Sequence, residues 1–158
     1  MFTGGSVIPT EVKFDQRSLG QLQRAMNKLP RDLAAKHLNF ATRKAAIVFQ
    51  LQAKANAASI GDSGLLAASM SVVKSKNHSK IDHVSSYFVR PQKNSKSRSH
   101  GGGNPKYPGD PFYWTFVEFG TINQAAQPFV RPAFSAKKAE ALGVFVKTLK
   151  SRLKLKRK

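Results

Sequence analysis

The longest periodic segment of the chain runs from Arg31 to about Ala57. Pro30 and Asp32 occupy positions that the first turn of a helix favours. Apolar residues then recur at steps of three and four, which is the spacing of one helix face, and most are alanine, so another helix or a sheet can approach closely. The segment therefore predicts one long central helix. Its stripe consists of Ala34, Leu38, Ala41, Ala45, Val48 and Gln52.

Shorter periodic segments flank this helix. Residues 10–14 alternate in a way that suits a short strand, and Asp15 is a candidate N-cap for a helix over residues 16–28 that Pro30 interrupts. Residues from Pro132 to about 155 predict a last helix with Lys and Arg outside its apolar face. The two apolar stripes are Leu19, Leu22, Met26 and Leu29 in the first helix, and Phe134, Leu142, Phe145, Leu149 and Leu153 in the last.

Two segments in the middle of the chain have the character of strands. Residues 70–74 alternate, and residues 81–90 are rich in β-branched and aromatic side chains, with a charged turn between the two and Pro91 after them. This pattern is typical of a β-hairpin. The predicted fold class is therefore α+β: a small antiparallel β-sheet packed against a long central helix, with a short N-terminal helix and a basic C-terminal helix.

The length of 158 residues fits a single domain spanning residues 1–158. Three segments of it are expected to stay outside the core. Residues 1–6 predict a flexible N-terminus, and residues 92–111 are rich in Gly, Pro and basic side chains, which predicts a mobile basic loop. Residues 154–158 form a basic tail.

The charge of the chain is strongly unbalanced, with 27 Lys and Arg against 8 Asp and Glu and a formal net charge of +19. Such an excess favours contact with a polyanion, either nucleic acid or an acidic protein. Two basic segments, residues 74–106 and 137–158, are separated by a nearly uncharged stretch. A solvated surface is the simpler interpretation of the loop cations. The candidates to face DNA or an acidic partner are Lys93, Lys96, Arg98, Lys106, Lys150, Arg152, Lys154, Lys156, Arg157 and Lys158.

The sequence contains no arrangement of residues typical of catalysis. It has no cysteine, its four histidines are scattered, and its acidic residues are isolated from one another, so neither a metal-dependent nuclease nor a zinc site is expected. No apolar run approaches the roughly 20 residues that span a bilayer, and the N-terminus lacks the pattern of a signal peptide. We therefore expect no enzymatic activity, no cofactor, no metal and no membrane contact, and synthesis in a cytoplasm.

The nearly uncharged stretch from Phe112 to Phe134 has one acidic residue, Glu118, in an aromatic run. A carboxylate in such company needs a cation or backbone N–H donors, and Arg131 is the natural candidate. Gly120 predicts a turn with positive φ. Pro128 and Pro132 predict an extended approach to the last helix. Periodicity leaves open whether residues 112–119 form a strand or a helix.

The same stretch resembles a family pattern. An aromatic residue before Val-Glu-Phe-Gly-Thr, a spacer, and Pro-Phe-hydrophobic-Arg-Pro-Ala occupy residues 116–121 and 128–133. Upstream, Ala53-Lys54 is followed by Asp62, Ser63, Gly64 and Leu65, where the pattern has a Thr-Gly-x-Leu turn and this chain has Ser63 in place of Thr, and then by Ser69. This combination is similar to the neck, or tail-completion, proteins of tailed double-stranded-DNA bacteriophages, also described as head-tail joining or minor tail components.

The resemblance implies a structural virion protein, located at the neck and synthesised in the host bacterial cytoplasm. It implies a homo-oligomeric ring, a hexamer or dodecamer, that joins the portal-adaptor complex to the tail terminator or tail tube around packaged double-stranded DNA. A free, non-specific nucleic-acid-binding protein of ribosomal or nucleoid type is the alternative, favoured by charge alone. The residues expected at subunit interfaces or in the structural motif are Phe112, Trp114, Phe116, Glu118, Phe119, Gly120, Pro128, Phe129, Arg131 and Pro132.

Overall fold

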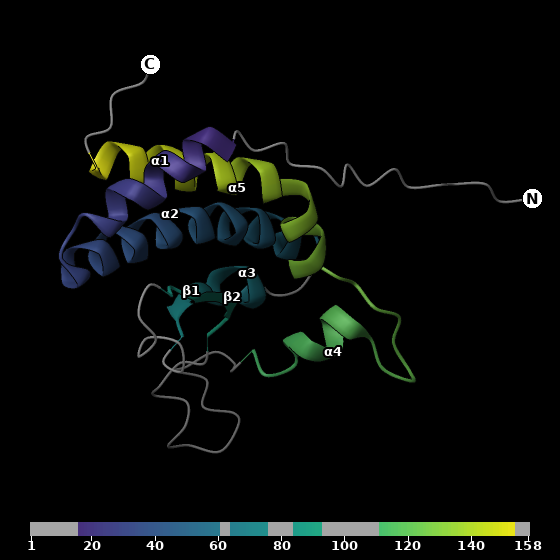
Figure 1. The fold of residues 1–158 in the computed structure, drawn as a ribbon. Helices are drawn as coiled ribbons and strands as arrows, with labels where there is room; N and C mark the ends of the chain where they lie inside the picture. Colours follow the sequence, from purple (N-terminus) through teal and green to yellow (C-terminus); the bar gives the residue numbers. More distant parts are fainter. Residues whose placement is uncertain (1–15, 61–63, 76–83, 93–110, 154–158) are drawn as a thin grey trace, which may run out of the picture.

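The computed structural model describes residues 16–60, 64–75, 84–92 and 111–153 (Figure 1). The expected strand at 10–14, the cap at Asp15, the flexible N-terminus, the basic tail and nearly all of the 92–111 loop lie outside the described residues. The elements follow in the order α1 (Gln16–Asn27), α2 (Arg31–Ala58), α3 (Leu65–Ser69), β1 (Met70–Lys74), β2 (Tyr87–Pro91), α4 (Trp114–Phe119) and α5 (Val130–Arg152).

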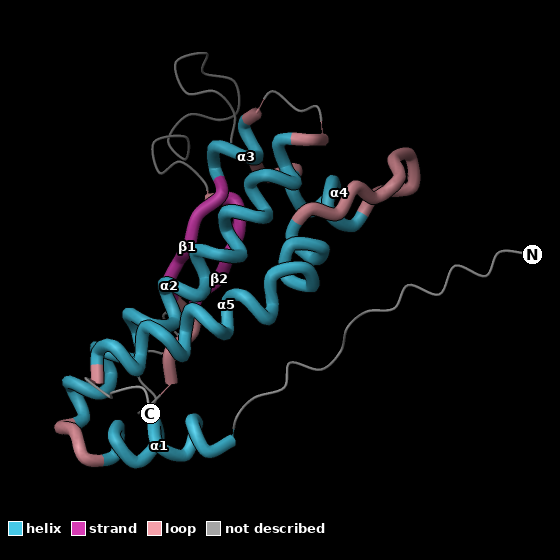
Figure 2. Tube along the Cα trace, turned by 90° about the horizontal axis from the view of Figure 1, so that it is seen from above, coloured by secondary structure: helices cyan, strands magenta, loops and turns pink. Residues whose placement is uncertain are grey.

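The long helix α2 lies at the centre of the molecule, as the sequence predicts. α5 runs antiparallel beside it and, together with α1, covers one side, while α3 and the two strands lie on the other side (Figures 1 and 2). Leu22 of α1, Ala41 of α2 and Leu149 of α5 are buried together where the three helices meet. The described chain is thus mostly helical with one small sheet, and the α+β class is confirmed.

The buried face of α2 differs in detail from the predicted stripe. Its most buried residues are all alanine, but Gln52 is only half-buried and its Nε2 donates to Oδ1 of Asn56 at 2.9 Å. The difference has a simple cause: layers pack on α2 from two directions, so no single 3.6-residue stripe describes the covered surface. The buried alanines are Ala34, Ala41, Ala46, Ala53 and Ala57.

The predicted hairpin strands are present and pair antiparallel, from Met70 opposite Pro91 to Lys74 opposite Tyr87. The second strand is shorter than expected, because residues 84–86 are not in a strand. β1 ends at Lys74, so the residues before Tyr87 have no residue of β1 opposite them. In the described chain, one backbone hydrogen bond continues beyond the two strands, from Ser75 N to Ser86 O at 2.9 Å. Pro91 is the last residue of β2 rather than the residue after it, and at a strand end its missing N–H is tolerated.

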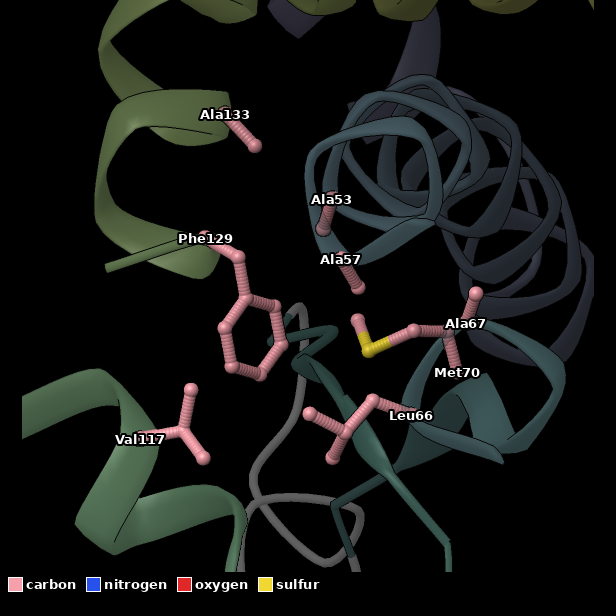
Figure 3. Close-up of a cluster of buried hydrophobic side chains, with 8 residues drawn as sticks. All are labelled: Ala53, Ala57, Leu66, Ala67, Met70, Val117, Phe129 and Ala133. Carbon is pink, nitrogen blue, oxygen red and sulfur yellow. The ribbon is translucent and has the colours of Figure 1, made fainter. Parts of the chain in front are cut away.

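The short helix α3 is not predicted by the sequence pattern. Gly64 precedes it in the left-handed conformation with φ 78°, and Leu66 and Ala67 are buried. These side chains join a core in which the Phe129 ring points toward Val117, Leu66 and Ala57 (Figure 3). The core therefore ties α4 and the start of α5 to the end of α2. Its buried members are Ala53, Ala57, Leu66, Ala67, Met70, Val117, Phe129 and Ala133.

Candidate functional site

The segment from α4 to the first turn of α5, residues 111–134, forms a corner at one end of the molecule (Figure 1). Residues 114–119 are helical, which decides between the strand and the helix that periodicity left open. Val117 and Glu118 of α4 are buried, whereas Phe116 and Phe119 are exposed. One face of this short helix thus packs on the core and the other faces outward.

Glu118 is the most elaborately bonded side chain of the corner. Glu118 is only 1% exposed. Oε2 accepts hydrogen bonds from the backbone N–H of Phe129 at 2.8 Å and of Val130 at 2.9 Å. Oε1 accepts from the backbone N–H of Arg131 at 3.0 Å and from Arg131 Nε at 3.2 Å. The carboxylate is therefore buried without being unpaired.

The three backbone donors are the N-terminal N–H groups of α5, since Phe129 is its N-cap and Val130 its first residue. The first four N–H groups of a helix have no partner within the helix. Glu118 accepts from three of them, and the fourth position is Pro132, which has no N–H. One carboxylate and one proline thus account for every free donor at this helix end, and the negative charge suits the helix dipole.

This arrangement corrects the expected lead-in to the last helix. Sequence reasoning placed residues between Pro128 and Pro132 in an extended segment, but the helix already begins at Val130. Proline is tolerated in a first turn because its nitrogen needs no partner there. The carboxylate that caps the helix belongs to Glu118, eleven residues before Phe129 in the sequence, so no local capping pattern indicates where the helix begins.

Arg131 pairs with Glu118 as the sequence predicts. In addition to the Nε contact, its Nη2 donates to the backbone oxygen of Glu118 at 2.8 Å, and its guanidinium lies 4.9 Å from the Phe119 ring centroid. The Arg131 side chain is 59% exposed, so solvent weakens its attraction to the carboxylate. The backbone donors, rather than the cation, are therefore the main partners of Glu118.

The loop from Gly120 to Pro128 is held at both ends. Gly120 N donates to Phe116 O at 2.8 Å, and Gln127 N donates to Val117 O at 2.8 Å. Inside the loop, Thr121 and Gln124 form an antiparallel bridge. These bonds make a fixed projection that extends away from the helical body (Figures 1 and 2).

Gly120 has φ 78° and ψ 176°, so the predicted positive φ is confirmed. This combination is essentially restricted to glycine. A Cβ here would lie 2.9 Å from Ala126 N and 3.0 Å from Gln124 O. The loop can therefore return against α4 only if residue 120 has no side chain.

Burial raises the pKa of Glu118, but hydrogen bonds from the backbone of Val130, Phe129 and Arg131 and from the Arg131 side chain outweigh it, so the pKa is lowered. A lowered folded-state pKa stabilises the fold above the unfolded value of about 4.3, and this contribution is lost as the pH falls through the folded value.

We therefore expect the free energy of unfolding, measured by urea titration, to fall as the pH is lowered from about 5 toward 3. Glu118→Gln should flatten this dependence. Glu140→Gln, which removes an exposed carboxylate paired with Lys137, is the matched control and should leave it nearly unchanged. Equal slopes for wild type and Glu118→Gln would contradict the capping role.

Large apolar side chains of the corner are exposed. Phe112, Phe116 and Phe119 are each half or more exposed, and Ile122, within the projecting loop, is fully exposed. Trp114 differs, because it is half-buried and packs against the core with Tyr113. Pro128 and Pro132 are exposed. Part of the aromatic run thus packs on the core and part of it lies on the surface, and none of the described side chains covers Ile122.

Among the basic candidates, only Lys150 and Arg152 belong to the described chain. Both lie in the last turn of α5, where positive charge suits the helix C-terminus. The Arg152 guanidinium lies 3.8 Å from the Phe40 ring centroid, so this side chain packs on α2. The other candidates lie outside the described residues: Lys93, Lys96, Arg98, Lys106, Lys154, Lys156, Arg157 and Lys158.

Sequence reasoning missed two residues that matter to the corner, one within it and one in α2. Ile122 stands as a single aliphatic side chain between polar ones, a signal that was readable but weak. Asn56 of α2 donates from Nδ2 to Phe129 O at 3.0 Å and so fixes the corner to the central helix. Nothing in the sequence near Asn56 indicates that partner, which lies 73 residues away.

Within residues 16–60, 64–75, 84–92 and 111–153, no group of three or more His, Cys, Asp or Glu side chains is placed to hold a metal ion. None of the helices described in those ranges is long and apolar enough to cross a bilayer. The best-defined feature of the site is the corner, where five hydrogen bonds link Glu118 to the first turn of α5. Fold and corner together define a small, basic α+β protein whose exposed apolar surface suits contact with other proteins.

A comparison with protein-family models matches residues 20–120 to the family described as "Bacteriophage HK97-gp10, putative tail-component". The match covers more than half of the chain, and the protein belongs to this family. Comparisons with curated proteins and with solved structures give no match. The resemblance to phage neck and tail proteins is thereby confirmed at the level of a phage tail component, which is a part of the virion. The second half of the motif, residues 128–133, lies beyond the matched range.

Proposed function

We propose that this protein is a non-enzymatic, structural ring component at the head-tail junction of a tailed bacteriophage. Copies of the chain surround the DNA channel and join the portal-adaptor complex to the tail. The observation that carries the proposal is the fixed corner at residues 111–134, which presents exposed apolar side chains in a chain of a phage tail family. A protein that works by holding neighbours together needs such a preformed contact surface.

The net charge of +19 supports a position next to DNA. Cations that face a channel contact phosphates without reading bases, which neutralises charge along the duplex. Exposed basic residues of α5 such as Lys138 and Lys147 are available for this in the described chain. Acidic faces of the neighbouring adaptor and tail terminator or tail tube proteins are the other partners that this charge fits.

The proposal predicts what happens when the basic loop is neutralised. Replacing Lys93, Lys96, Arg98 and Lys106 with Ser should leave the circular dichroism spectrum and melting temperature of the protein unchanged. Infectious yield should fall, with capsids and tails accumulating unjoined in electron micrographs, because these cations no longer contact DNA or an acidic neighbour.

Two outcomes would contradict the proposal. A normal yield from the quadruple variant would show that the loop charges are only solvated. Absence of the protein from purified virions, measured by mass spectrometry, would contradict the structural role itself. In that case, salt-sensitive binding of the free protein to duplex DNA would favour the nucleic-acid-binding alternative.

A further inference from the structure

The described surface contains a second apolar feature, which adjoins the corner at Val130 and Phe134. It is a groove of about 320 Å³ between α2, β2 and the start of α5. Phe88 and Phe134 stand at this groove and are each about half exposed, and Phe134 stacks on Phe49 with ring centroids 4.9 Å apart. The buried alanines Ala46 and Ala53 also line it.

The groove carries no charge. Its lining consists of Thr42, Ala45, Ala46, Phe49, Ala53, Tyr87, Phe88, Val89, Val130 and Phe134. The projecting loop likewise has no charged residue from Phe119 to Val130. In a chain of net charge +19, both surfaces are thus uncharged, and each exposes large apolar side chains: Ile122 on the loop, and Phe88 and Phe134 at the groove.

We infer that the Ile122 loop of one copy inserts into the α2–β2–α5 groove of a second copy of this chain. This inference rests on the proposed function and names the contact between its subunits. DNA and the acidic surfaces of neighbouring proteins are attracted to the basic segments rather than to uncharged surfaces. Two strongly basic copies, by contrast, approach with least repulsion where neither surface carries charge.

The loop does not fill the groove of its own chain. Ile122 is fully exposed, and the bonds of Gly120 and Gln127 to α4 hold the loop away from the body (Figure 2). Phe88 and Phe134 remain half exposed. Among the described residues, both halves of the contact are therefore uncovered at the same time, and a fixed loop loses little conformational entropy when it docks.

A projection on one surface that fits a groove on another makes a head-to-tail contact. Such a heterologous contact repeats from copy to copy and closes into a ring when the rotation allows it. A two-fold symmetric dimer would make the same contact twice, with the loop of each copy in the groove of the other. The number of copies in the native assembly distinguishes the dimer from a ring.

Cross-linking tests this contact directly, because the chain has no cysteine of its own. Single variants Ile122→Cys and Phe88→Cys, carried on chains of different length, are mixed and mildly oxidised. Leu51→Cys replaces Phe88→Cys in the control, since Leu51 is an exposed apolar residue of α2 that does not line the groove. Melting curves establish that each variant is folded.

The expected result is a disulfide between Ile122→Cys and Phe88→Cys chains in roughly tenfold or greater yield than with the Leu51→Cys control, a ratio worth about 1.4 kcal/mol of preference. Equal yields, or preferential pairing of Ile122→Cys with itself, would overturn the inference. If cross-linking fails while virions contain the protein, the subunit contact alone is wrong. If virions lack the protein, the proposed function is wrong and the cross-link still reports on the contact.

Discussion

The substitution Glu118→Ala is expected to lower the free energy of unfolding by about 3–5 kcal/mol, the scale for removing one partner of a buried charged network. The carboxylate of Glu118 accepts hydrogen bonds from the backbone N–H groups of Phe129, Val130 and Arg131. Without it, the N-terminus of α5 keeps these donors unpaired beside the core, and a cavity is left in α4. Urea titration monitored by circular dichroism measures the change.

Two control variants separate the capping role from a simple ion pair. Arg131→Ala should cost only about 1 kcal/mol or less, because the side chain is 59% exposed and the backbone N–H of residue 131 is retained. Glu140→Ala removes an exposed carboxylate and should change stability by no more than about 0.5 kcal/mol. Equal losses for Glu118→Ala and Arg131→Ala would mean that the ion pair, not the helix cap, stabilises the corner.

The second large effect is expected for Gly120→Ala, a loss of about 3 kcal/mol that combines backbone strain with steric collision. The φ and ψ of Gly120 are unfavourable for any residue with a Cβ, and that atom would lie within 3.0 Å of the backbone at Gln124 and Ala126. Because both neighbours are backbone atoms, they cannot move aside as a flexible side chain would. The loop would have to change its path or leave α4.

Gly64→Ala is the matched control for this substitution. Gly64 also has φ 78°, but its ψ is 0° and a Cβ there would meet no atom within 4 Å. The expected loss is therefore only the cost of the left-handed conformation, about 1–2 kcal/mol. Thermal unfolding of both variants checks the difference. A loss at Gly120 no larger than at Gly64 would contradict the close approach of the loop to α4.

The main helices could be predicted from the sequence because apolar residues recur in each at helical spacing, although the faces that are buried match the predicted stripes only in part. The stripe that includes Leu22 and Met26 marks α1, and the alanines from Ala34 onward mark α2, with ends close to those observed. The hairpin was predictable from β-branched and aromatic residues, but the first residue of β2 was not. That residue depends on where β1 stops offering partners, which is a tertiary property.

The corner could be predicted only in part. A lone carboxylate among aromatic residues requires partners, and this requirement correctly pointed to Arg131. The larger contribution of the α5 backbone was missed, because it depends on two helices meeting at a definite angle. The groove was missed for the same reason: Phe88 and Phe134 are 46 positions apart and come together only through their packing on α2.

Family membership and the structure support different conclusions about this chain. Family membership defines a phage tail component. The corner provides a fixed loop with the exposed side chain of Ile122. The α2–β2–α5 groove provides an uncharged surface that is also lined by apolar side chains. The ring, its position at the head-tail junction and the pairing of these two surfaces are our proposals, and they are independent enough to be tested one at a time.

A cryo-EM map of the head-tail junction, from the phage that encodes this chain, tests the central proposal most directly. We expect ring density between the portal-adaptor complex and the tail that fits copies of the α2–α5 body. In that ring, the Ile122 loop of each copy should lie in the groove of the next, with basic side chains toward the DNA. A junction fully accounted for by other proteins, with no density for this chain, would contradict the proposal.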